Sequence, residues 1–226
     1  MPSPIEIFDR LEKYLSTAIR ENSIALSLST TDGRVNSQKD EKEISKALRL
    51  FTHSNEWFTE NNLKLDVAMA RHWYDFAISD NNGLFLPVNI KVSKLTTGDN
   101  ISSKGGVFYA LTGVLPEKVN SGINTWERFC ENLASRLDPY SAADYYFMVI
   151  SKKSEDKVFW TSLKNISSLI SNGNNPPFQC RWSANRERSN RPAEDAHKYI
   201  LRVLRETFRL RAEALKSFDL HLKDFT

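Results

Sequence analysis

Apolar residues recur along this chain at two spacings, one typical of helices and the other of strands. Spacings of three and four residues predict amphipathic helices over Ile5–Ile19, Asp40–Phe51, Thr125–Leu137 and Ala193–Phe218, with a shorter helix over Asn55–Asn61. Alternating or β-prone residues predict strands over Ser23–Ser29, Val67–Ile78, Leu84–Val92, Tyr145–Ile150 and Val158–Thr161. Turn residues or polar residues predict loops at Thr31–Gly33, Thr96–Asn100 and Asn172–Pro177, whereas Val107–Val114 fits a helix or a buried strand. The mixture predicts an α/β fold with a central mixed sheet flanked by helices, in one domain spanning residues 1–226.

The strongest local signal is a hairpin around Asn81-Asn82-Gly83. A three-residue loop there pairs residues whose numbers sum to 164, which places Asp75 opposite Asn89. Lys91 shares a face with Asn89, because side chains two apart on a strand point the same way. A two-residue turn would instead place Asp75 opposite Ile90 and on the wrong face. Pro87 cannot donate to a ladder, so we expect an edge or a bulge there.

Composition restricts the class of protein without naming a partner. Of the 226 residues, 40% are apolar and 26% are charged, which excludes wholesale disorder. The chain has no apolar run long enough for a membrane span, and no secretory leader is expected at its start. Cys130 and Cys180 lack the spacing of a zinc site and suit a reducing compartment. We therefore expect a cytoplasmic protein.

Positive charge is concentrated near the end of the chain. The net charge is +3, but Arg181–Arg211 alone carries nine basic and four acidic residues. Arg202, Arg205 and Arg209 in this segment are candidates for phosphate contacts. The alternative is a solvated helix face with intrahelical ion pairs.

Asp75, Asn89 and Lys91 together offer a specific chemistry. Carboxylate and amide oxygens are hard ligands suited to Mg²⁺, which polarises a phosphate oxygen and lowers the pKa of a bound water. A neighbouring lysine can help to deprotonate that water or stabilise charge on the phosphate. The alternative is a surface hairpin with one ion pair.

The order of these residues resembles a nuclease signature. Asp75 followed by Asn89-Ile90-Lys91 resembles the active-site motif of the PD-(D/E)xK superfamily, and the first half of the chain resembles its EcoRV-like type II restriction endonucleases. The residues that carry the resemblance are Ser29-Thr30-Thr31-Asp32-Gly33-Arg34, Ser37-Gln38-Lys39-Asp40, Leu48-Arg49-Leu50-Phe51, Tyr74-Asp75-Phe76, Asn89-Ile90-Lys91 and Gly105-Gly106. The resemblance covers roughly a third of the chain in order and spacing, and the remainder in layout alone.

The resemblance implies a restriction-endonuclease-like core and a Mg²⁺-dependent active site. Asp75, Asn89, Lys91 and Glu43 would be catalytic, and Asp75, Asn89, Ile90 and Glu43 would ligate the metal. Two departures from the motif are Tyr74, in place of proline, and Asn89, in place of the second acid. The first helix of such enzymes supplies another acid, but the aligned position holds Arg49. Glu43 is therefore the substitute, with Glu41 next, although both also suit a helix N-terminus.

The resemblance also implies a homodimer that cuts double-stranded DNA at a palindromic site, leaving blunt ends. The recognition loop would contribute Asn172, Gly173, Asn174, Asn175, Gln179 and Arg181, since amides pair with adenine edges and arginine with guanine or phosphate. Lys104 would touch the scissile backbone, and the N-terminal helix is a possible dimer face. The alternatives are a repair or junction-resolving nuclease of the same superfamily, and a DNA-binding module that lost its chemistry with Asn89.

Overall fold

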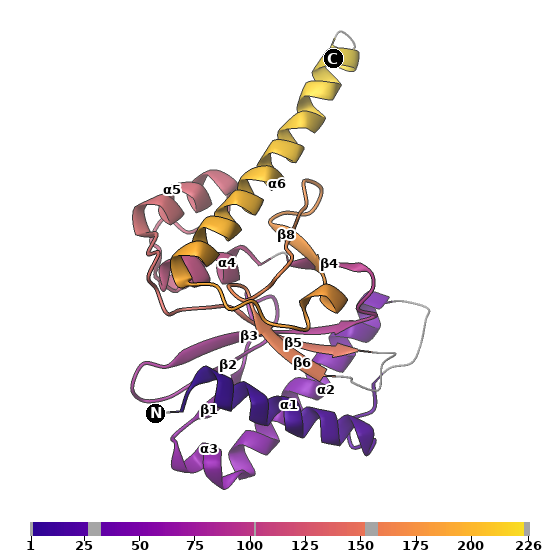
Figure 1. The fold of residues 1–226 in the computed structure, drawn as a ribbon, viewed down its shortest axis with the longest axis vertical. Coiled ribbons are helices and arrows are strands. Elements are labelled where there is room, and N and C mark those ends of the chain that lie inside the picture. The colour runs from indigo at the N-terminus through magenta and orange to yellow at the C-terminus, as the bar shows by residue number, and fades with distance from the viewer. Residues whose placement is uncertain (1, 27–32, 102, 152–157, 224–226) are drawn as a thin grey trace.

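A five-stranded mixed sheet lies between two layers of helices in the computed structural model, which describes residues 2–26, 33–101, 103–151 and 158–223 (Figure 1). Its strands are β1 (Lys64–Val67), β2 (Phe76–Ser79), β3 (Phe85–Ser93), β5 (Tyr146–Ser151) and β6 (Val158–Ser162), in the order β1-β2-β3-β5-β6. Neighbouring strands are antiparallel except β3 and β5, which are parallel and are therefore joined by a long crossover over residues 94–145. The predicted central mixed sheet flanked by helices is confirmed.

Three helices cover one face of the sheet: α1 (Pro4–Arg20), α2 (Gly33–Ser54) and α3 (Glu56–Glu60). A capping box begins α1, where the Ser3 hydroxyl accepts the Glu6 N–H and the Glu6 carboxylate accepts the Ser3 N–H. Phe8 on α1 stacks on Tyr146 and lies against Trp160. The even-numbered residues of β3 and β5, such as Val88 and Met148, point into this core.

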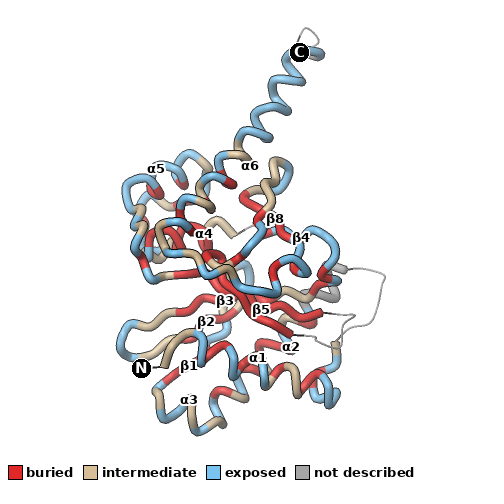
Figure 2. Tube along the Cα trace, viewed as in Figure 1, coloured by how far each residue is buried: buried red, intermediate tan, exposed pale blue. Residues whose placement is uncertain are grey.

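The opposite face is covered by α4 (Lys104–Thr112), α5 (Trp126–Arg136), the first half of α6 (Ala193–Leu222) and a small second sheet. That sheet has the order β4 (Gly98–Ile101), β8 (Phe178–Arg181), β7 (Ile170–Ser171). Two short 3-10 helices, η1 (Pro116–Lys118) and η2 (Trp182–Asn185), complete the described elements. Figure 2 shows the buried residues concentrated in the strands between the two helical layers.

The second half of α6 leaves the body. Its first half packs through Ile200, Val203 and Leu204, but every described residue from Arg211 to His221 is exposed (Figures 1 and 2). Among the helices of the described residues, none is long and apolar enough to cross a membrane.

Most predicted elements are present, and Val107–Val114 falls largely within α4. The prediction of one strand over Val67–Ile78 is wrong, because Arg71 adopts a φ of +68° and the chain reverses between β1 and β2. The predicted loop Thr96–Asn100 contains the start of β4, since pairing with the distant β8 orders it. The predicted strand Ser23–Ser29 is not a strand at residues 23–26, and residues 27–29 lie outside the described residues, as do Thr31 and Asp32 of the predicted turn.

Candidate active site

The hairpin register brings the candidate residues together. Phe76 pairs with Val88 and Ala77 with Pro87, which is the predicted sum of 164. The loop has three residues, Asn81–Gly83, and is closed by a 3.3 Å hydrogen bond from the Asp80 N–H to the Leu84 carbonyl. Gly83 has a φ of +98°, a conformation that glycine adopts without strain.

Pro87 lies where β3 tolerates a missing donor. The parallel pairing with β5 begins only at the next residue, Val88, opposite Tyr146. Pro87 pairs with Ala77 on β2 but lies outside the ladder to β5, so β3 has an open edge toward β5 at this residue.

Asp75 lies just before β2 and is held by β3. Its Oδ2 accepts hydrogen bonds from Asn89 Nδ2 at 2.8 Å and from the Ile90 N–H at 2.6 Å. Partial burial raises the pKa of the Asp75 carboxyl, against the Ile90 hydrogen bond and the charge of Lys91, which lower it. The site is thus a partly desolvated carboxylate fixed by two donors.

Lys91 brings a positive charge to the same face of β3 as Asn89, opposite the core that α2 covers. Among the described residues its ammonium makes no hydrogen bond or ion pair. The charge of Lys91 is also felt by Cys180 on β8. Burial, together with the charge of Asp99, raises the pKa of the Cys180 thiol to about 12, against the charge of Lys91, which lowers it. The charge of Lys91 thus acts on both Asp75 and Cys180, and its ammonium is free to meet an anion.

Residues that the sequence did not single out position the segment before Asp75. The Trp73 carbonyl accepts hydrogen bonds from the Tyr145 hydroxyl at 2.8 Å and the Ser103 hydroxyl at 2.9 Å. A Cβ at Gly105 would lie 2.6 Å from the Trp73 ring, and one at Gly106 would lie 2.4 Å from the Tyr145 ring. The glycine pair is the sequence signal for this close packing, which fixes the backbone leading into Asp75.

The oxygen atoms near Asp75 suit a hard cation only in part. Asp75 Oδ1 makes no hydrogen bond to any described residue, and rotation of the Asn89 amide would present its oxygen. The Ile90 carbonyl points to the same side as its N–H, toward Asp75. Within the described residues, however, no group of three acidic, histidine or cysteine side chains could hold a metal. The chain itself therefore offers Mg²⁺ one carboxylate and two neutral oxygens.

Glu43 does not join this group of oxygen atoms. It is exposed on α2, which packs against the face of the sheet opposite Asn89 and Lys91, and no described contact of Asp75 or Asn89 involves it. Glu41 is on the same helix. Arg49, at the position aligned with the acid of the family, instead lines a groove of about 650 Å³ between α2, α3 and β1. The structure thus brings together three of the four predicted catalytic residues.

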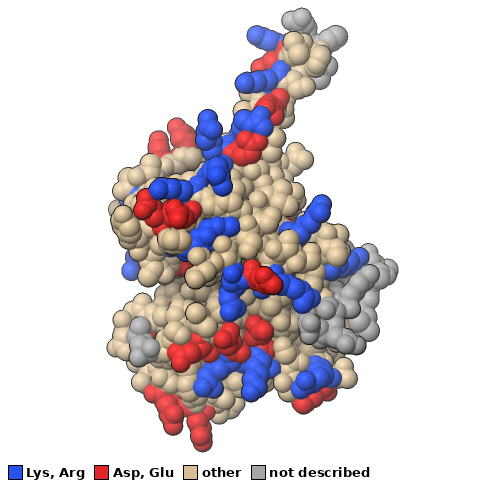
Figure 3. Space-filling model, in the orientation of Figure 1, with Lys and Arg blue, Asp and Glu red and all other residues tan. Residues whose placement is uncertain are grey.

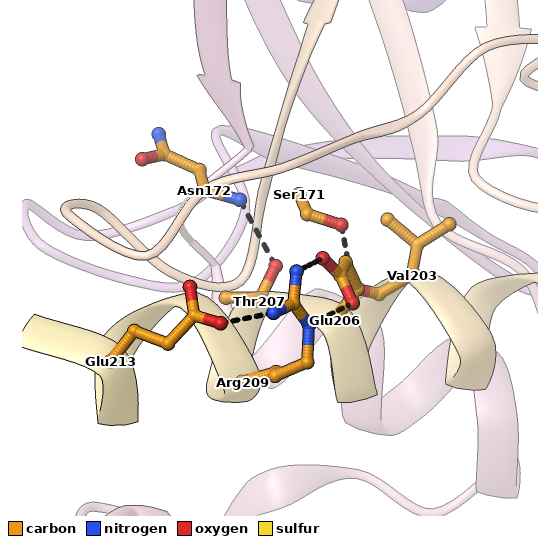
Figure 4. A network of polar contacts seen from close by, with 7 residues as sticks. All are labelled: Ser171, Asn172, Val203, Glu206, Thr207, Arg209 and Glu213. Carbon is orange, nitrogen blue, oxygen red and sulfur yellow. Dashed lines mark hydrogen bonds and ion pairs between the residues drawn. The ribbon is translucent and has the colours of Figure 1, made fainter. Parts of the chain in front are cut away.

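The predicted recognition loop is anchored on α6 (Figure 4). The Asn172 N–H donates to the Thr207 hydroxyl at 3.0 Å, and the Ser171 hydroxyl donates to the Val203 carbonyl at 3.0 Å. The Asn172 side chain is committed internally, since its amide donates to Asn100 and accepts the Asn175 N–H. A Cβ at Gly173 would approach the α6 backbone to 3.1 Å, so Gly173 allows the loop to lie close to the helix.

Other members of the predicted loop remain available to a ligand. The side chains of Asn174 and Asn175 are exposed and make no hydrogen bond to a described residue. Arg181 is exposed at the end of β8, and the half-buried Gln179 lies on β8 beside Gly98. Lys104 is occupied, because its ammonium donates to the Asn124 carbonyl and lies 4.8 Å from the centre of the Trp126 ring.

The basic residues of α6 differ in how far their charge is free. Arg209 is paired with both Glu206 and Glu213, and Lys198 with Glu194, so basic and acidic side chains alternate along the helix in Figure 3. Arg202 and Arg205 are exposed and form no ion pair with a described residue. The structure therefore leaves two of the three predicted phosphate contacts, Arg202 and Arg205, outside the ion pairs of the described residues.

Comparison with known proteins adds no assignment: no protein-family model matches the chain, and no curated protein is significantly similar to it. A function for this chain is therefore inferred from its residues and their arrangement.

Proposed function

We propose that this chain is a Mg²⁺-dependent type II restriction endonuclease that acts as a homodimer on double-stranded DNA, cutting a palindromic site to leave blunt ends. The observation that carries the proposal is the meeting of Asp75, Asn89 and Lys91 on one hairpin, with Asp75 bonded to Asn89 at 2.8 Å. The order of elements around it supports a PD-(D/E)xK core, since β1, β2, β3 and β5 belong to one mixed sheet with β3 as its central strand, and α2 and α4 cover its two faces.

The residues have distinct roles in the proposed reaction. Asp75, the amide oxygen of Asn89 and the Ile90 carbonyl would hold Mg²⁺, which when bound polarises the scissile phosphate and acidifies a water. Lys91 would stabilise negative charge developing on the phosphate, because it lies on the same face of β3 as Asn89 and its ammonium forms no ion pair with a described residue. Tyr145 and Ser103 would position Asp75 through the Trp73 carbonyl.

The DNA contacts would come from the small sheet and from α6. Asn174, Asn175, Gln179 and Arg181 would reach base edges or phosphates. Changing Asn174 or Asn175 to alanine is expected to reduce discrimination against single-base variants of the site by about 1–3 kcal/mol per lost bidentate contact. Asn172→Ala is the matched comparison: it should loosen the loop, because its amide bonds Asn100 and the Asn175 N–H.

One observation favours a second function, a DNA-binding module without chemistry. Asn89 presents its amide nitrogen to Asp75 and occupies one carboxylate oxygen, an arrangement that is stable without a metal. Such a module would bind DNA but leave it intact, whereas a repair or junction-resolving nuclease would cut without a fixed site.

A digest of defined plasmid and branched DNA with and without Mg²⁺, with the product ends mapped, distinguishes the three functions. Discrete blunt fragments that require Mg²⁺ support the restriction enzyme, and unspecific or branch-directed cuts support the other nucleases. If the wild type binds DNA without cutting it, and Asp75→Ala and Lys91→Met bind DNA with the same affinity, the result supports the DNA-binding module. Lys94→Met, an exposed lysine just beyond β3, controls for loss of charge alone.

A further inference from the structure

The projecting half of α6 carries apolar side chains that its own chain does not cover. Leu215 is 63% exposed and Phe218 is 42% exposed, and all described residues between Arg211 and His221 are exposed. An isolated helix of this length is marginal in water, because most helical stability comes from packing of an amphipathic face. The segment therefore has the surface of a helix that packs against a partner.

These residues form one face. At about 100° per residue, Arg211, Ala212, Phe218 and Asp219 all lie within about 60° of Leu215 around the helix. The other exposed leucine, Leu220, lies about 140° from Leu215 and so on a different side. The Leu215 face is defined here as Arg211, Ala212, Leu215, Phe218 and Asp219.

We propose that the Leu215 face binds the same face of a second copy of this chain, with the two α6 helices antiparallel and crossing at Leu215. A two-fold axis at Leu215 pairs residues whose numbers sum to 430. Arg211 of one copy then faces Asp219 of the other, and Ala212 faces Phe218. These two pairs form one layer of the interface, and the two-fold axis repeats the same layer on its far side.

Each such layer is complementary in charge and in size. It opposes a cation, Arg211, to an anion, Asp219, and a small side chain, Ala212, to a large one, Phe218. Arg211 and Asp219 form no ion pair with any described residue of their own chain, whereas the nearby Arg209 does. A parallel pairing in register would instead set Arg211 against Arg211, which is repulsive.

A second copy fits this face better than DNA does. The face presents three apolar side chains, one cation and one anion, whereas a phosphate-binding surface needs an excess of uncompensated cations. The pairing rests on the proposed function in so far as that function requires a homodimer, but it is measured separately, by the mass of the particle and not by cleavage.

Sedimentation of the full chain without DNA tests the pairing. Wild type should associate to at least twice the 26.0 kDa of one chain. Leu215→Asp should halve the particle mass, and Leu220→Asp, the matched loss of an exposed leucine on another side, should not. A wild type that stays at the mass of one chain at tens of micromolar, or equal effects of the two variants, would overturn the proposal.

Charge reversal tests the register. Arg211→Asp and Asp219→Arg should each raise the dissociation constant by about 10-fold or more, because two contacts become repulsive. The double variant should recover association, and an equimolar mixture of the single variants should form a mixed dimer. Circular dichroism checks that α6 stays helical in each variant. Failure of both the double variant and the mixture to associate would rule out the antiparallel register.

Discussion

Replacing Asn89 by aspartate places a second carboxylate beside Asp75 and leaves the size of the side chain almost unchanged. In the wild type the Asn89 amide donates to Asp75 Oδ2 at 2.8 Å, so the variant replaces an attractive contact by two like charges. At about 4 Å and an effective dielectric of about 20, the repulsion is roughly 4 kcal/mol, and the lost hydrogen bond adds about 1 kcal/mol. Side-chain rotation and solvent reduce this, so we expect a loss of about 2–4 kcal/mol at neutral pH without metal.

The loss should depend on pH with a definite sign. Burial already raises the pKa of Asp75, and a second carboxylate raises the apparent pKa of the pair further. A carboxyl pair with a raised pKa in the folded state keeps its proton longer than in the unfolded chain. The variant should therefore be close to wild type near pH 4, where the pair shares a proton, and lose stability as the pH rises to 7.

Thermal unfolding in EDTA and in Mg²⁺ provides the assay. At pH 7.5 in EDTA, Asn89→Asp should lower Tm by roughly 5–15 °C, at about 2–4 °C per kcal/mol for a chain of this size. Mg²⁺ should restore much of that loss, because binding to the folded state alone stabilises it. Asn89→Ala, which lacks the added charge, should show neither the pH dependence nor the rescue. An Asn89→Asp protein with wild-type Tm in EDTA, or one that Mg²⁺ does not stabilise, would refute the metal-site assignment.

Three further predictions concern other parts of the molecule. Asp75→Ala should abolish Mg²⁺-dependent cleavage while leaving DNA binding within a few fold in a mobility-shift assay; near-normal cleavage would mean that the metal site lies elsewhere. Gly106→Ala should cost about 1–3 kcal/mol in chemical denaturation, because its Cβ would lie 2.4 Å from the Tyr145 ring, and a neutral result would show that the ring moves freely. Replacing Arg202 and Arg205 by glutamine should weaken binding to all DNA sequences alike and reduce the slope of affinity against salt, since each phosphate contact releases counterions; an unchanged slope would assign both side chains to solvent.

The hairpin was predictable because residues close to one another in the sequence determine it. Asn81-Asn82-Gly83 sets the loop, the loop length sets the register, and the register alone places Asp75 opposite Asn89. The amphipathic helices were predictable for the same reason, since α1 and α5 carry complete apolar stripes and caps within their own sequences.

Elements ordered by distant partners were not predictable in this way. The first three residues of β4, Gly98-Asp99-Asn100, have low β propensity and become a strand by pairing with β8, about 80 residues later. The segment before Asp75 has β-prone residues, but Trp73 packs on Tyr145 and Tyr109 and bends the chain out of the sheet. Glu43 is suited to metal binding by its carboxylate. Only the packing of α2 reveals that it lies on the other side of the sheet from Asp75 and Asn89.

The packing of α1 on β6 has a consequence for synthesis of the chain. Trp160 donates to Asp9 at 2.7 Å across a separation of 151 residues, so the surface that covers α1 is made long after α1 itself. At about 5–20 residues per second, the apolar stripe of α1 waits about 8–30 s on the ribosome before Trp160 is added across those 151 residues. The nascent chain thus presents Phe8 without Tyr146 and Trp160 for most of its translation, and the core between α1 and the sheet is complete only when β6 has emerged.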